Sequence, residues 1–169
     1  RQFEFPDVVH ERLWGVKYLV LLALFGLSLQ SMYNGMAVLI DRQFEPGAAL
    51  KSISHLKPTI TAFAPAMIQM LLEQPGFKDF DLSRLQRMFY GASPMPEAVA
   101  LDLLAKLPWV AACQLYGQTE SAPLLTALVS RYHTADGGRL RSAGRALPAT
   151  ELLIVDDEGK EVPRGEVGE

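Results

Sequence analysis

Residues 109–121 read WVAACQLYGQTES, a short apolar run followed at once by a polar cluster. The apolar part predicts a buried strand over residues 110–115. The polar part brings an aromatic ring, a glycine, a hydroxyl and a carboxylate together between Tyr116 and Glu120. At a strand end the ring could stack on a base, the glycine would let backbone approach a phosphate, the hydroxyl could donate to phosphate oxygen, and the carboxylate could face Mg²⁺. The pentapeptide alone fits an ordinary strand-to-loop turn equally well.

Upstream of this stretch, apolar and β-branched runs alternate with segments of helical character. Strands are predicted at 36–40, 59–63, 85–90, 110–115 and 124–129, and helices at 16–33, 46–55, 65–73 and 96–106. Strands that alternate with helices indicate βαβ units. The sequence therefore predicts an α/β fold with a mostly parallel sheet and flanking helices.

After Tyr116 the alternation of predicted strands and helices stops. Residues 134–141 are polar and rich in glycine, and residues 151–155 and 161–162 flank the turn sequence DDEG at 156–159. That pattern predicts a β-hairpin. We expect a central α/β portion over residues 1–130 and the start of a small β subdomain over 131–169.

Composition narrows the class of protein. The chain has 169 residues, 49% hydrophobic and 21% charged, with a net charge of −3 and no Lys/Arg run, which argues against nucleic-acid binding. Its one cysteine, Cys113, excludes an internal disulfide and is expected to fill the core rather than act as a nucleophile. The apolar stretch 18–29 is shorter than the roughly 20 residues that span a bilayer. We expect a cytoplasmic protein and leave peripheral membrane association open.

The three histidines show no metal-ligand spacing. His10 and His133 are expected at the surface, and His55 at a helix end where a positive ring would suit the helix dipole. None of the three is expected to be catalytic.

Two polar segments are predicted at the same edge of the sheet. In open parallel sheets ligands bind beyond the carboxyl ends of the strands. Residues 91–93 (GAS) and 116–120 (YGQTE) both follow predicted strands, so they should share one site. The alternative for residues 91–93 is a tight turn before a helix that starts at Pro96. Ser93 is not expected to be a hydrolase nucleophile, because the Gly-x-Ser-x-Gly pattern is absent.

Four blocks occur in a recognisable order: FYGASPMPE at 89–97, QLYGQTES at 114–121, SAGRALPATELLIVDDEGK at 142–160 and VPRGEVGE at 162–169. In this order they resemble the adenylate-forming (AMP-binding) superfamily, and most closely its acyl-CoA synthetase or fatty-acid–CoA ligase branch. The resemblance runs from about Ala37 to the last residue. It implies part of the large N-terminal domain of an acid–thiol ligase. Such an enzyme uses ATP to activate a carboxylic acid, here expected to be a fatty acid, as acyl-AMP and passes the acyl group to coenzyme A.

The resemblance also implies roles for individual residues. Main-chain atoms of the first segment would line the adenine and acyl pockets, the Tyr116 ring would pack on adenine, and the residues after it would contact the phosphates. Thr119 would contact the α-phosphate and Glu120 would hold Mg²⁺, which makes these two the expected catalytic residues. The residues assigned to nucleotide binding are Gly91, Ala92, Ser93, Gln114, Leu115, Tyr116, Gly117, Gln118 and Thr119.

Other parts of the family pattern are not found. The phosphate loop ending in Gly-Lys, the Thr-Gly-Asp segment and the late lysine are absent, and Phe25 is followed by Gly26 where the family has Phe-His. Ala146 and Ala149 stand where the family often has Pro and Gly. We therefore expect a central fragment that is inactive alone and needs N- and C-terminal parts of the same enzyme. A non-catalytic binding remnant and an amino-acid-activating domain remain the alternatives.

Overall fold

A computed structural model describes residues 37–40, 43–118, 124–148 and 150–168. The chain divides into two compact units, residues 1–42 and 43–169, and the fold below is that of the second. The strand predicted at 36–40 is wrong over residues 37–40, which have no regular secondary structure and are exposed. The helix predicted at 16–33 and His10 lie outside the described residues.

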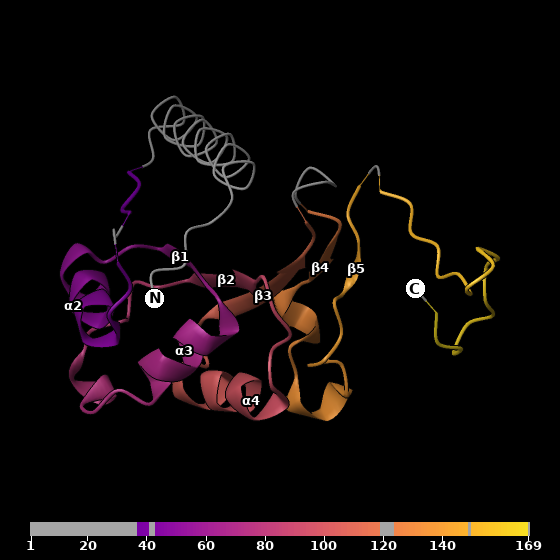
Figure 1. Cartoon of the computed structure of the whole chain (residues 1–169). Coiled ribbons are helices and arrows are strands. Elements are labelled where there is room, and N and C mark those ends of the chain that lie inside the picture. The colour runs from indigo at the N-terminus through magenta and orange to yellow at the C-terminus, as the bar shows by residue number, and fades with distance from the viewer. Residues whose placement is uncertain (1–36, 41–42, 119–123, 149, 169) are drawn as a thin grey trace, which may run out of the picture. The chain divides into compact units, whose positions relative to one another are not determined.

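Five strands form one sheet in the order β1-β2-β3-β4-β5 (Figure 1). The strands are β1 (Ile60–Phe63), β2 (Arg87–Gly91), β3 (Ala111–Tyr116), β4 (Thr126–Leu128) and β5 (Arg145–Ala146). The first three run parallel, whereas β4 is antiparallel to β3 and β5 is antiparallel to β4. The predicted α/β class is confirmed, with an antiparallel edge added to the parallel part.

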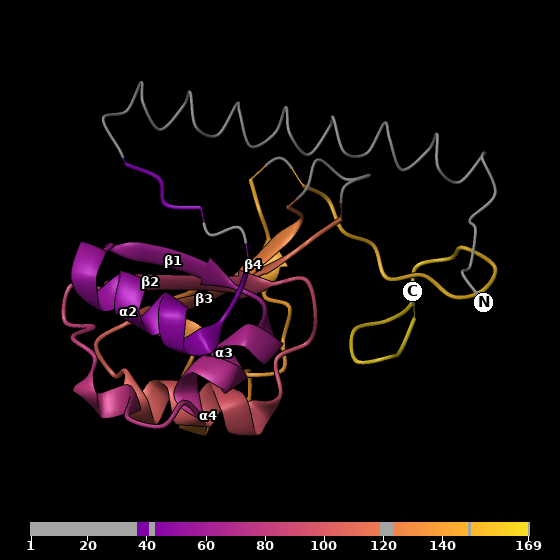
Figure 2. The same ribbon diagram turned by 60° about the vertical axis from the view of Figure 1, so that its left-hand side comes forward.

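Three helices cover one face of the parallel strands (Figure 2). They are α2 (Pro46–Leu56), α3 (Pro65–Leu72) and α4 (Glu97–Lys106). Proline is the first residue of α2 and α3 and precedes the first residue of α4. The fixed φ of proline suits the start of a helix. Proline lacks a backbone N–H, but the N–H groups of the first helical turn have no partner within the helix, so no hydrogen bond is lost. The predicted helices 46–55, 65–73 and 96–106 are thus confirmed with small shifts at their ends.

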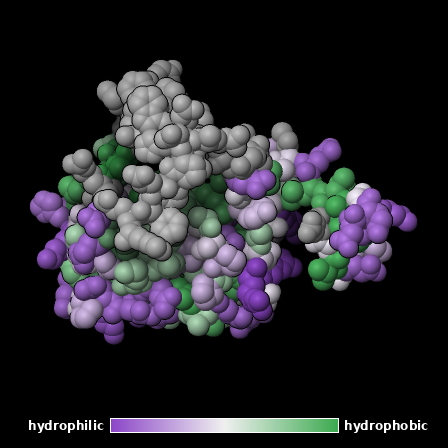
Figure 3. Space-filling view, viewed as in Figure 1, coloured by the Kyte–Doolittle hydropathy of each residue, from purple (hydrophilic) through white to green (hydrophobic). Residues whose placement is uncertain are grey.

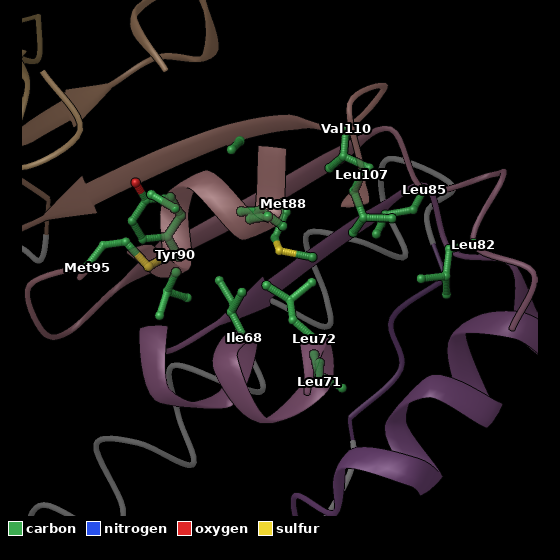
Figure 4. Packing of buried hydrophobic residues seen from close by; sticks show 14 of the residues in the cluster. Ile68, Leu71, Leu72, Leu82, Leu85, Met88, Tyr90, Met95, Leu107 and Val110 are labelled. Carbon is green, nitrogen blue, oxygen red and sulfur yellow. The ribbon is translucent and has the colours of Figure 1, made fainter. Parts of the chain in front are cut away.

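The core lies between these helices and the sheet. Met88 and Tyr90 on β2 are buried on the helix side, where Figure 4 shows them above Ile68 and Leu72 of α3. Burying one such side chain stabilises the fold by roughly 1.5–3 kcal/mol. The intervening Phe89 is only half-buried, as expected when successive side chains of a strand point to opposite faces. Figure 3 shows hydrophilic and apolar side chains mixed on the outer surface, and Met70 of α3 and Leu101 of α4 are 49% and 39% exposed.

The C-terminal segment makes a turn but no named strand. Val155 and Glu161 form one antiparallel bridge, and the Asp156 amide donates to the Lys160 carbonyl at 2.9 Å. The Asp156 carboxylate accepts from the Lys160 amide at 2.8 Å and so closes the turn. The predicted hairpin is therefore reduced to one bridge. The boundary predicted at residue 130 stays a prediction.

Within the described ranges, no helix has the length and apolar character needed to cross a membrane.

Candidate functional site

The ends of β2 and β3 lie side by side, as the sequence predicted. These parallel strands pair Tyr90 with Gln114 and Gly91 with Leu115, so both end at one edge of the sheet. We call residues 91–93 and 114–118 at this place the strand-end edge. It brings together the described members of the two predicted segments.

Gly91 is required by the packing of the strands. A Cβ atom built on it would lie 2.3 Å from the main-chain oxygen of Leu115, closer than real Cβ contacts come. Any larger residue would push β2 away from β3 at the strand-end edge. The absence of a side chain here therefore has a structural cause, beside any role in admitting a ligand.

Ala92 has a backbone conformation that residues with a Cβ rarely adopt. Its φ is 68°, in the left-handed region, and its side chain is exposed. Such strain costs about 1–3 kcal/mol and occurs preferentially at functional sites. Ser93 is also exposed, so both residues remain accessible at the point where the chain leaves β2 for α4.

The end of β3 combines a buried amide with an exposed ring. Gln114 is 7% exposed, and its Oε1 has no hydrogen-bond partner among the described residues. Tyr116 is 52% exposed, and its carbonyl accepts from the Leu125 amide at 2.9 Å. An accessible aromatic ring anchored through its own backbone is suited to stacking on a flat ligand.

The remaining predicted residues differ in what the structure says of them. Leu115 and Gly117 are half-buried and Gln118 is exposed. Thr119 and Glu120 lie outside the described residues, so their catalytic and metal roles stay predictions. In the described part of the chain, no group of three or more His, Cys, Asp or Glu side chains could hold a metal ion.

A buried polar pair behind the strand-end edge was missed by sequence reasoning. His133 is only 6% exposed, and its Nε2 lies 2.7 Å from the Tyr90 hydroxyl. Its Nδ1 lies 3.3 Å from the Val129 carbonyl, so Nδ1 carries the proton and Tyr90 donates to Nε2. The prediction that His133 lies at the surface is wrong. The 3-10 turn η3 (Ser130–Tyr132) returns the chain so that the next residue, His133, reaches the end of β2.

Burial sets the protonation states of this pair. It raises the pKa of Tyr90 to about 12, with a smaller contribution from Cys113, and it lowers the pKa of His133 against the opposing effect of the Val129 carbonyl. Both groups are therefore neutral near pH 7. Their hydrogen bond links β2 to the segment after β4.

Two other titratable side chains were also expected to have particular positions, and the prediction that Cys113 fills the core is wrong, because Cys113 is not among the buried core residues. Cys113 is half-buried, and burial raises the pKa of its thiol although Arg87 opposes this, which disfavours the reactive thiolate. His55 lies in the last turn of α2.

Comparison with known proteins gives a consistent picture. The family model described as "AMP-binding enzyme" matches residues 13–169. A fatty acid–[acyl-carrier-protein] ligase of Streptomyces coeruleorubidus is 34% identical over 140 residues, which are 83% of this chain and 27% of that protein. A medium/long-chain-fatty-acid–CoA ligase of Mycobacterium tuberculosis is 32% identical over 139 residues, 82% of this chain and 24% of that protein.

A solved structure agrees with these relatives. The amide bond synthetase McbA of Marinactinospora thermotolerans superposes with a TM-score of 0.73 at 33% identity, over 79% of this chain and 26% of that one. The chain thus spans about a quarter of the length of the curated relatives it matches. Because the family model covers nearly the whole sequence, the chain belongs to the AMP-binding enzyme family of adenylate-forming ligases.

Proposed function

We propose that this chain forms part of an ATP-dependent acyl-CoA synthetase that activates a fatty acid. The observation that carries the proposal is the strand-end edge, where a strained Ala92 and an accessible Tyr116 ring end two adjacent parallel strands. Membership of an AMP-binding family supports a nucleotide as the ligand of this edge.

The chemistry consists of two transfers. An oxygen of the acid's carboxylate attacks the α-phosphorus of ATP, pyrophosphate leaves, and an acyl-AMP forms. The thiol of coenzyme A then attacks the acyl carbon, loses its proton, and AMP leaves. The first transfer depends mainly on positioning and on neutralising phosphate charge.

The residues of the strand-end edge suit the positioning task. The Tyr116 ring would stack on adenine, and the main chain at residues 91–93 and 117–118 would contact the nucleotide. Thr119 would donate to the α-phosphate. A Mg²⁺ ion held by Glu120 and phosphate oxygens would supply charge neutralisation, since this cation is commonly bound through one or two carboxylates plus phosphates.

The names of the two relatives support a fatty acid as the substrate. The two relatives differ in the acyl acceptor, so the acceptor must be tested. Both act on fatty acids, one with an acyl-carrier protein and the other with coenzyme A. The matching solved structure is an amide bond synthetase. We assign coenzyme A as the acceptor because the motif blocks are most similar to those of the acyl-CoA synthetase branch.

The test is ATP–pyrophosphate exchange in the complete protein with a panel of fatty acids. Base–aromatic stacking is worth about 1–3 kcal/mol, so Tyr116→Ala should weaken ATP use by roughly 5–150-fold. Thr119→Ala should also reduce exchange. Trp109→Ala is a matched control, because Trp109 is 53% exposed but precedes the start of β3.

Equal exchange in the parent, Tyr116→Ala and Thr119→Ala proteins would overturn the site assignment. Nucleotide binding without exchange would show a non-catalytic binding module. Exchange with amino acids but not fatty acids would show an amino-acid-activating domain. Thioester formation with coenzyme A, compared with a carrier-protein thiol and an amine, then identifies the acceptor.

A further inference from the structure

Three arginine side chains surround one aromatic ring. The guanidinium carbons of Arg131, Arg139 and Arg145 lie 4.9, 5.2 and 5.4 Å from the centre of the Tyr132 ring. Arg131 and Tyr132 belong to η3, Arg139 follows the 3-10 turn η4 (Ala135–Gly137), and Arg145 begins β5. We call these four residues the tri-arginine cluster. Its arginines are exposed and its ring is half-buried.

Among the residues that the structure describes, no ion pair compensates the positive charge of the cluster. The ion pairs among the described residues are Lys57–Asp81 and Lys106–Asp102, so none of the three arginines is paired with a described carboxylate. Since all three guanidinium carbons lie within 5.4 Å of one point, their separations cannot much exceed the Debye length of about 10 Å, and their mutual repulsion is only partly screened. A neutral ring offers each cation only a modest attraction. An anion bound among them would relieve this repulsion in a chain whose net charge is −3.

The backbone holds the arginines in place. Tyr132 precedes His133, which is anchored to Tyr90, and the Tyr132 amide donates to the Val129 carbonyl at 3.0 Å. Arg145 pairs with Ala127 across β4 and β5. The residue before it, Gly144, has φ 93°, and a Cβ there would lie 2.1 Å from Ala127 main-chain atoms.

Arg139 is fixed in a similar way. Its carbonyl accepts from the Ser142 amide at 2.9 Å, and its neighbour Leu140 is fully buried. The three side chains therefore start from backbone positions set by buried or close-packed neighbours. The backbone thus brings the three arginines to one ring without the help of a ligand.

We propose that the tri-arginine cluster is a binding site for a phosphate group. Guanidinium groups match phosphate oxygens in planar, two-pronged hydrogen bonds, and three of them suit a dianion better than a single carboxylate. The phosphate could belong to a phosphorylated nucleotide such as the 3′-phosphate part of coenzyme A, or be free inorganic phosphate. None of the four residues belongs to the strand-end edge, and the proposal does not rest on the proposed function.

The experiment titrates the complete protein with two probes, inorganic phosphate and adenosine 3′,5′-bisphosphate, by calorimetry. Arg131→Gln and Arg145→Gln should each weaken binding about tenfold or more, and added NaCl should weaken binding in the parent. Arg84→Gln is the matched control, because it removes one exposed arginine outside the cluster. Melting temperatures of all variants are compared to show that each remains folded.

Two further variants test the ring. Tyr132→Leu removes the surface on which the arginines rest and should weaken binding, whereas Tyr132→Phe keeps that surface and should retain it. Tighter binding of the bisphosphate than of phosphate identifies the nucleotide as the source, and equal binding identifies free phosphate.

The proposal is overturned if neither probe binds at millimolar concentration, or if both cluster variants bind like the parent. An equal loss in Arg84→Gln would also overturn it, because the attraction would then be general. These results are distinguishable from failure of the proposed function, since neither probe is a substrate of the ATP–pyrophosphate exchange reaction.

Discussion

Replacing Tyr90 by Phe should destabilise the fold through a single lost hydroxyl. The ring would keep its place in the core, where Tyr90 is 2% exposed. The change removes only the donor that lies 2.7 Å from His133 Nε2 and leaves that buried acceptor without a partner. Leaving a buried polar group unsatisfied costs about 1–3 kcal/mol.

The size of this effect makes it measurable. A loss of about 2 kcal/mol corresponds to roughly 4–8 °C in Tm for a protein of 150–250 residues. Urea unfolding at pH 7.5, followed by circular dichroism, should show a lower midpoint with an unchanged slope. Tyr132→Phe is the control, because it also removes one tyrosine hydroxyl but keeps the ring that the described contacts of Tyr132 with Arg131, Arg139 and Arg145 involve.

The reasoning would be refuted if Tyr90→Phe were as stable as the parent, or if Tyr132→Phe lost as much. A changed urea slope would point instead to an altered compactness of the unfolded or folded state. The comparison requires only a folded protein and no knowledge of substrate.

Further predictions concern pH and the backbone. Burial lowers the pKa of folded His133 below the unfolded value of about 6.5, so the contribution of His133 to the free energy of unfolding is complete above that pH and is lost as pH falls towards the folded pKa. Urea unfolding measured from pH 7.5 to 5 should show this loss of stability. A His133→Gln variant should lose less stability over the same range. Gly91→Ala should cost about 1–3 kcal/mol in urea unfolding, because the added Cβ meets the Leu115 carbonyl, and stability equal to the parent would contradict the close approach. Ala92→Gly should be neutral or stabilise the fold by up to about 2 kcal/mol, because it releases the backbone strain at this position. Ala98→Gly within α4 should instead destabilise the fold by about 0.5–1 kcal/mol. Equal losses of stability in the two variants would show that Ala92 is not strained.

The sequence predicted best those helices and strands whose boundaries carry clear residue signals. Prolines at or before the first residue indicated α2, α3 and α4, and apolar or β-branched runs indicated β1 to β3. The alternation of these helices and strands along the chain predicted the α/β class. The meeting of residues 91–93 with Tyr116 followed from the same alternation, because adjacent parallel strands end at one edge.

What the sequence could not reveal depends on distant contacts. His133 carries no local signal, and its burial is created by Tyr90, 43 positions away. The need for glycine at position 91 depends on its register with Leu115, which no local pattern states. The same holds for the tri-arginine cluster, whose members come from η3, the segment after η4, and β5. At residues 37–40 an apolar run alone was not sufficient evidence for a strand.

Cys113 gives the protein a built-in chemical reporter. It is the one cysteine in the sequence, it pairs with Phe89 in the sheet, and its strand position places it on the face opposite the buried Ala112 and Gln114. A thiol-reactive dye would therefore label one known position without background from other sites. Its reaction should be slow at neutral pH, because burial raises the thiol pKa, and should quicken as pH rises. The labelling rate in longer and shorter versions of the protein would then measure how well neighbouring segments shield that side of the sheet.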